Sequence, residues 1–112
     1  GILKETTGEP SMPTEAELFA ALKQVKDPEL DMDVVSLGLV YGASALPNGR
    51  VEVVFTLTYP GCPAAGDIAE EIGERLARLP GVRTVVPKLV WDPPWDPSRM
   101  SEEARLELGY PV

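Results

Sequence analysis

The feature that most constrains the fold is an alternating run that follows an Asn-Gly pair. In residues 50–58 the apolar side chains fall on every second position, which is the period of a β-strand. Asn48-Gly49, just before this run, is a strong signal for a hairpin turn. We therefore predict that residues 34–45 form a second strand, antiparallel to the first. The apolar positions of the run are Val51, Val53, Phe55 and Leu57.

A helical pattern follows the hairpin. Apolar residues recur at helical spacing over residues 65–79, with charged residues on the other faces. Pro80-Gly81 ends this helix, and residues 82–91 are predicted to form a third strand in which Pro87 favours an edge position. A strand, a helix and a returning strand usually form a right-handed crossover. The third strand is therefore expected to lie parallel to one strand of the hairpin.

Helices are predicted before and after this unit. Thr14 and Glu17 have the spacing of a capping box at a helix start. Asp27-Pro28 is expected to end that helix, because a residue that precedes proline avoids the α region. Near the other end of the chain, Ser101 is expected to cap a short helix over residues 102–108.

Together these elements predict an α+β fold, α-β-β-α-β with a short C-terminal helix. Its sheet would be small and mixed, an antiparallel hairpin plus a crossover strand, covered by helices. The 112 residues of the chain are enough for one compact core and not for two. We expect residues 1–12 to form a flexible tail and residues 13–112 to form a single domain.

The charge of the chain excludes several classes of partner. Eighteen acidic residues against ten basic ones give a formal net charge of −8, which repels nucleic acid and anionic membrane surfaces. The chain has no apolar run near the ~20 residues that a membrane-spanning helix needs, and no signal peptide is visible. We therefore expect a cytoplasmic protein that binds neither nucleic acid nor membranes.

The chain has one cysteine, and its position is informative. Cys62 lies between Gly61 and Pro63, where the strand gives way to the helix. Because proline is favoured at the first position of a helix, Cys62 is predicted to be the N-cap, near free backbone N–H groups. That environment lowers the pKa of a thiol and makes it reactive. Local physics favours neither this interpretation nor that of a buried structural cysteine.

The chain has no histidine, which limits the chemistry of Cys62. Cysteine hydrolases usually pair the thiolate with a histidine base, so we expect no catalytic role. One thiolate cannot complete a four-ligand zinc or iron–sulfur site within one chain. As a metal ligand, Cys62 is therefore suited to transient binding, and a homodimer or a client protein could supply the remaining ligands.

Three more residues are candidates for the same site. Asp27 and Glu29 could bring carboxylate oxygens to the sulfur, or could belong to an ordinary solvated acidic loop. Thr58 leads into the Cys62 turn and could donate a hydrogen bond to the thiolate, or could simply satisfy the β propensity of its strand.

Several short motifs occur in order along most of the chain: Asp27-Pro28-Glu29, residues 34–41, Thr56-Leu57-Thr58, Gly61-Cys62-Pro63, Gly81-Val82, Leu89-Val90-Trp91, Pro94-Trp95 and Met100-Ser101. Over roughly residues 14–109 this ordered set resembles the SufT/PaaD-like family of small iron–sulfur cluster assembly proteins, the domain of unknown function 59.

The resemblance implies a compact α+β domain whose cysteine serves the maturation of iron–sulfur proteins. It implies transient binding of iron or a cluster, none of it permanently held within one chain, and partners that are iron–sulfur client or assembly proteins. It also implies that Asp27, Glu29 and Thr58 lie near Cys62. The chain departs from the family at Tyr59, where family members often have a second threonine. An accessory role in a phenylacetate-type multicomponent oxygenase pathway and a non-catalytic protein-interaction module remain as alternatives.

Overall fold

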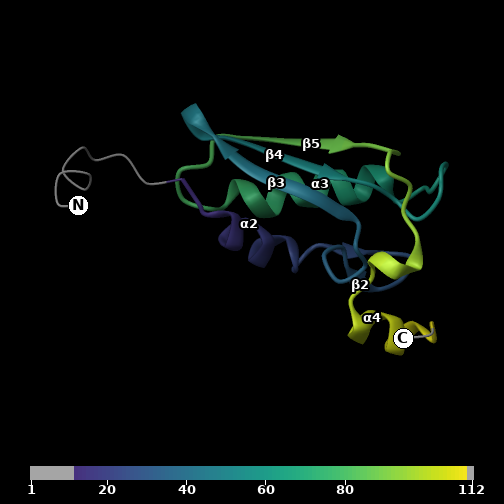
Figure 1. The fold of residues 1–112 in the computed structure, drawn as a ribbon. Coiled ribbons are helices and arrows are strands. Elements are labelled where there is room, and N and C mark those ends of the chain that lie inside the picture. The colour runs from purple at the N-terminus through teal and green to yellow at the C-terminus, as the bar shows by residue number, and fades with distance from the viewer. Residues whose placement is uncertain (1–11, 111–112) are drawn as a thin grey trace.

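The centre of the fold is a three-stranded sheet, seen in a computed structural model that describes residues 12–110 (Figure 1). Its strands lie in the order β3 (Val40–Leu46), β4 (Arg50–Phe55) and β5 (Thr84–Leu89). β3 and β4 are antiparallel, whereas β4 and β5 are parallel. The predicted α+β fold, with a mixed sheet built from a hairpin and a crossover strand, is confirmed.

The hairpin turn forms where the Asn-Gly pair predicts it. Pro47–Gly49 makes a single 3-10 turn, η1, in which Asn48 has a φ of 67° and Gly49 a φ of 78°. Asparagine and glycine are the residues that adopt this left-handed conformation most readily. The turn sets the register of the two strands, with Leu46 directly opposite Arg50.

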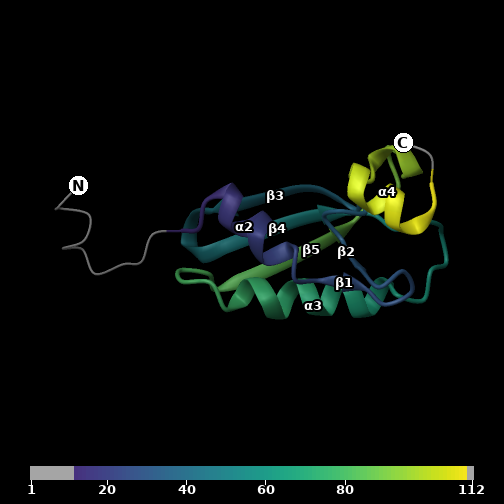
Figure 2. The ribbon, with the colours of Figure 1, turned by 90° about the horizontal axis from the view of Figure 1, so that it is seen from below.

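Two helices cover one face of the sheet (Figures 1 and 2). α2 (Glu15–Leu22) packs against β3, and α3 (Ala65–Ala77) packs against β5. The alternation predicted for β4 is confirmed, because its apolar positions are buried beneath the helices. The core between the helices and the sheet includes Leu18, Leu22, Val51, Val53, Phe55, Ile68, Ile72 and Leu76.

The opposite face of the sheet has no helix over it within residues 12–110 (Figure 1). On β4, Glu52 accepts hydrogen bonds from Arg50 at 3.0 Å and from Lys88 of β5 at 3.1 Å. These two hydrogen bonds, from Lys88 first and then from Arg50, lower the pKa of the Glu52 carboxyl. Charged pairs of this kind suit a sheet face that meets solvent.

The edge position predicted for the third strand is confirmed, since β5 is the last strand of the sheet. The Val90 N–H donates to the Phe55 carbonyl at 2.9 Å, and residues that hydrogen-bond to a parallel neighbour alternate along a strand. Pro87 therefore faces away from β4, where its missing N–H removes no bond from the sheet.

The first helix begins as predicted and ends earlier than predicted. Thr14 and Glu17 form a complete capping box, with each side chain accepting a hydrogen bond from the backbone N–H of the other. The helix ends at Leu22, so Asp27-Pro28 is not its stop. After a short turn, β1 (Lys26–Asp27) and β2 (Met32–Asp33) form a small antiparallel pair. Two-residue strands are too short to show a period, and the sequence pattern did not predict them.

The predicted strand over residues 34–45 is wrong in its first half, because β3 begins only at Val40. Residues 34–38 form turns, in which the Leu37 N–H donates to the Asp33 carbonyl at 3.1 Å. Gly38 has a φ of 74°, which a strand residue does not adopt. The apolar residues of this segment are buried in turns and so imitate a strand pattern.

Residues 90–101, which we call the C-terminal strap, pass alongside these turns. The Trp95 indole N–H donates to the Leu37 carbonyl at 2.7 Å, and the Ser101 N–H donates to the Ser36 carbonyl at 2.8 Å. The strap therefore binds the end of the chain to the turn that precedes β3.

The final helix, α4 (Glu102–Leu108), has the predicted bounds. The Ser101 hydroxyl accepts a hydrogen bond from the Ala104 N–H at 3.1 Å, as expected of an N-cap. Most of the predicted N-terminal tail, residues 1–11, lies outside the described residues, as do residues 111–112. Met12, the last residue of the predicted tail, packs against the core.

Candidate functional site

The first part of the site is the turn between β1 and β2. Asp27 is buried, with 1% of its surface exposed, and its Oδ1 accepts hydrogen bonds from the N–H groups of Glu29 and Leu30, at 2.7 and 3.3 Å. The Asp27 carbonyl accepts a third, from the Asp31 N–H at 2.7 Å. The Asp27 carboxylate thus organises the turn and fixes the point from which the Glu29 side chain extends.

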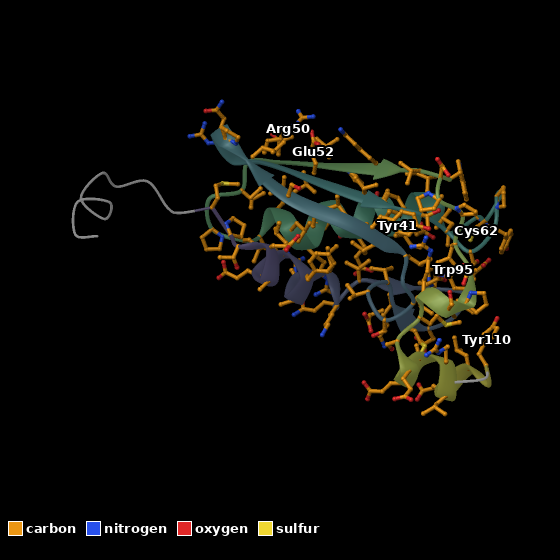
Figure 3. All side chains as sticks on the ribbon, in the orientation of Figure 1. Tyr41, Arg50, Glu52, Cys62, Trp95 and Tyr110 are labelled. Atoms are coloured by element: carbon orange, nitrogen blue, oxygen red, sulfur yellow. The ribbon has the colours of Figure 1, made fainter. Side chains whose placement is uncertain are left out.

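The second part is the segment that joins β4 to α3. Gly61 has a φ of 85°, which lets the chain turn sharply after Tyr59 and Pro60. The Cys62 carbonyl then accepts a hydrogen bond from the Ala65 N–H at 3.4 Å. Figure 3 shows Cys62 at the end of the molecule opposite to Arg50.

The prediction that Cys62 is the N-cap of this helix is wrong. α3 begins at Ala65, and its N-cap is Ala64, which already has a helical backbone conformation. A short turn over Pro63 and Ala64 separates the cysteine from the helix. Proline therefore starts this turn, and Ala64 supplies the backbone N–H that lowers the pKa of the thiol.

The two parts meet in a contact between Cys62 and Glu29. The Cys62 thiol donates a hydrogen bond to Glu29 Oε1, with 3.4 Å between sulfur and oxygen. The hydroxyl of Tyr59 donates to the same oxygen at 3.3 Å. One carboxylate oxygen therefore receives two donors from the segment that follows β4.

The expectation of an activated thiol is also wrong. Cys62 has only 6% of its surface exposed, and this burial raises the pKa of the thiol. The Ala64 backbone N–H bonds to the sulfur and lowers the pKa, as the helix argument proposed. The hydrogen bond to Glu29 and the charges of Glu29 and Asp27 raise the pKa further. A buried thiol beside two carboxylates keeps its proton.

The remaining candidates are placed differently. Thr58 is half-buried, and no hydrogen bond joins its hydroxyl to Cys62 within the described part of the chain. Thr56 is fully buried, and its Oγ1 has no hydrogen-bond partner among the described residues. Asp27 and Glu29 lie near the sulfur, as the resemblance implied, with Glu29 in contact and Asp27 shaping the turn.

Sequence reasoning missed the role of Tyr59. Tyr59 is 47% exposed as a whole. Loss of hydration at its hydroxyl, followed by the charges of Glu29 and Cys62, raises the pKa of Tyr59, so the hydroxyl remains a donor to Glu29. The available signal was the departure from the family pattern at this position, where a long side chain replaces a short one. Nothing in the local sequence showed that the hydroxyl reaches a residue 30 positions away.

The site brings together too few ligands to enclose a metal. Among residues 12–110, no group of three or more His, Cys, Asp and Glu side chains is arranged to hold a metal ion. Cys62 and Glu29 offer one soft and one hard ligand, and the Oδ1 atom of Asp27 is occupied by backbone N–H groups. A metal bound here would need further ligands from another molecule.

None of the helices between residues 12 and 110 combines the length and the apolar character needed to cross a bilayer.

Comparisons with known proteins bear on this arrangement. A family model described as "Iron-sulfur cluster assembly protein" matches residues 15–86. A maturation auxiliary factor for Fe-S proteins from Bacillus subtilis, YitW, is 44% identical over 92 residues, which cover 82% of this chain and 90% of the relative. The factor SufT from Staphylococcus aureus is 40% identical over 85 residues, covering 76% of this chain and 97% of the relative. A crystal structure of a domain of unknown function 59 from Bacillus anthracis has a TM-score of 0.81 and 42% identity, covering 85% of this chain and 91% of that one.

Proposed function

Because this chain belongs to the iron–sulfur cluster assembly protein family, we propose that it is a maturation factor for iron–sulfur proteins whose Cys62 binds iron, a cluster or a client. The resemblance predicted from the sequence is confirmed, since relatives of similar length are named as maturation factors. The contact of 3.4 Å between Cys62 and Glu29 carries the proposal, because it places a thiol and a carboxylate where both can reach one ion.

The raised pKa of Cys62 defines the resting state of the site. A thiol must lose its proton before it can bind a metal. Glu29 accepts the S–H hydrogen bond and so lies on the path by which the proton leaves. The Ala64 N–H stays on the sulfur and stabilises the thiolate once it forms. The free protein therefore holds a protonated, unreactive thiol, and the binding of a metal is coupled to the loss of this proton.

The shortage of ligands favours transfer over storage. Iron–sulfur clusters and structural zinc sites are held by four protein ligands, and this site offers two, the Cys62 sulfur and the Glu29 carboxylate. A second copy of the chain or a client protein would supply the others, so the cargo would be shared as soon as it was bound. We propose a binding role without catalysis, because the site holds and passes on a ligand and needs no histidine base.

Iron binding tests the proposal directly. The protein is incubated without oxygen with Fe²⁺ and sulfide, and absorption and Mössbauer spectra are recorded for wild type and Cys62→Ser. Thiolate–iron absorption is expected in wild type and is expected to be lost in Cys62→Ser. Ser44→Ala, an exposed change on β3, is the matched control and should resemble wild type.

Client maturation is the second part of that test. In cells that lack the protein, wild type and Ser44→Ala should restore the activity of iron–sulfur enzymes, whereas Cys62→Ser should not. Equal iron binding and equal maturation by Cys62→Ser and wild type would contradict the proposal, provided that both proteins unfold at the same denaturant concentration.

The burial of Cys62 supports one alternative, a protein-interaction module in which the cysteine is structural. In that case Cys62→Ser would lower stability and leave client maturation unchanged at equal protein level. The accessory role in an oxygenase pathway remains a prediction from the family resemblance, and no contact in the site favours it.

A further inference from the structure

Tyr59 stands out because it acts on the site through Glu29. Its hydroxyl lies 3.3 Å from Glu29 Oε1, the oxygen that also receives the Cys62 thiol at 3.4 Å. Glu29 is itself exposed to solvent, and its long side chain has several rotamers available. Some interaction must therefore hold this carboxylate against the thiol.

The thiol alone is a poor candidate for that task. An S–H group is a weak hydrogen-bond donor, whereas a tyrosine hydroxyl is a full donor, although its contact with Glu29 at 3.3 Å is longer than the strongest O–H···O⁻ bonds. Tyr59 is also well suited to hold a fixed position. Its side chain has only two χ angles, and the following Pro60 restricts its backbone to extended conformations.

We propose that Tyr59 is a positioning residue that keeps Glu29 turned onto Cys62 in the free protein and releases Glu29 when the thiol takes up metal. The proposal rests on the function proposed above and adds the residue that controls access to the thiol. A threonine at this position would carry its hydroxyl on Cβ, far from the place that the tyrosine hydroxyl occupies. The chain as it stands would therefore hold its site closed more firmly than a variant with threonine there.

Alkylation of Cys62 by iodoacetamide measures how firmly the thiol is held. Tyr59→Phe keeps the ring and removes only the hydroxyl, so Glu29 is free to turn into solvent. The alkylation rate of the folded protein is expected to rise about threefold or more, in the range of coupling measured for residues in contact. Tyr110→Phe is the matched control, since Tyr110 is exposed at the far end of α4 and should leave the rate unchanged (Figure 3).

A double-mutant cycle separates positioning from simple shielding. If Tyr59 acts through Glu29, the change Tyr59→Phe should have no further effect once Glu29→Ala is present. An equal acceleration in both backgrounds would overturn the proposal, because the ring would then act by covering the thiol. An unchanged rate in Tyr59→Phe would overturn it as well. Tyr59→Thr provides a second variant and should behave like Tyr59→Phe.

Titration with Co²⁺ alone provides a spectroscopic readout. The thiolate-to-cobalt band is expected to appear at about threefold lower Co²⁺ in Tyr59→Phe, because the hydroxyl no longer competes for Glu29. Equal Co²⁺ affinities in wild type and Tyr59→Phe would overturn the release step. A band that is absent from wild type, or present in Cys62→Ser, would instead contradict the proposed function, and the alkylation rates would still decide the positioning role.

Discussion

The core beneath the sheet and the end of the sheet near Cys62 are both buried, but they are built from different side chains. The core between α2, α3 and the sheet is mainly aliphatic, with Phe55, and the same buried cluster extends to Cys62 at the site. Two polar side chains are buried among residues 12–110, Asp27 and Thr56, and both belong to the segments that form the site. Burial under the helices removes apolar surface from water, whereas burial at the site encloses polar groups.

The difference between apolar and polar burial indicates which region stabilises the fold and which region lowers its stability. Apolar burial stabilises the folded state, while a buried polar group costs free energy unless it is hydrogen-bonded. Two backbone N–H groups that donate to one oxygen of Asp27 offset its desolvation. The Thr56 hydroxyl has no hydrogen-bond partner among the described residues, so its desolvation is not offset. Three substitutions would show whether the two regions divide stability and function in this way.

The largest effect is expected from Ile72→Ala in the core. Ile72 lies on α3 and is fully buried, so its truncation leaves a cavity and should lower the free energy of unfolding by about 2–5 kcal/mol. Urea denaturation measures the change, and Glu70→Ala, an exposed change on the same helix, should cost far less. A loss below about 1 kcal/mol would mean that the core is looser than its burial indicates.

A smaller effect is expected from Asp27→Ala at the site. The change leaves the N–H groups of Glu29 and Leu30 without their acceptor, which should cost about 1–3 kcal/mol. It should also displace Glu29 and so change the alkylation rate of Cys62, which Ile72→Ala should not do. Asp27→Asn keeps an oxygen at the same place and should lose less. Equal losses in the two variants would show that the backbone hydrogen bonds matter little.

The smallest effect, of opposite sign, is expected from Thr56→Val. Valine has nearly the shape of threonine and removes a buried hydroxyl that has no partner, so stability should rise by about 1 kcal/mol. Thr58→Val, at a half-buried position, is the matched control and should change stability less. If Thr56→Val destabilises the protein, the hydroxyl is satisfied in solution and the contrast between the two regions weakens.

The sequence predicted the fold wherever a period or a turn signal was long enough to be unambiguous. The alternation of β4 and the Asn48-Gly49 turn gave the hairpin, and the position of Pro87 gave the edge strand. Residues 34–39 were predicted as a strand and form turns, because apolar side chains buried in turns have the same sequence pattern as those of a strand. β1 and β2 were missed for the opposite reason, since two residues are too few to show alternation.

The sequence predicted which residues form the site, but it did not predict that the Cys62 thiol is buried and protonated. The family resemblance brought Asp27, Glu29 and Cys62 together, although local patterns gave no reason to pair residues 33 positions apart. The activated thiol was wrong because helix-end reasoning considers only the local amides. Burial and two carboxylates come from tertiary packing, and they outweigh the single N–H of Ala64.

The turn at Gly38 has a consequence for mutational tolerance. Gly38 has a positive φ, and a methyl group added there would clash with the Arg99 backbone of the C-terminal strap. Because the added methyl group would meet backbone atoms, no flexible side chain could move aside to make room. Even alanine at position 38 would therefore force the turn and the C-terminal strap apart. In a deep mutational scan we expect this position to accept no replacement, although it lies neither in the core nor in the contact between Cys62 and Glu29. Libraries that vary the segment between β4 and α3 should keep Gly38 unchanged.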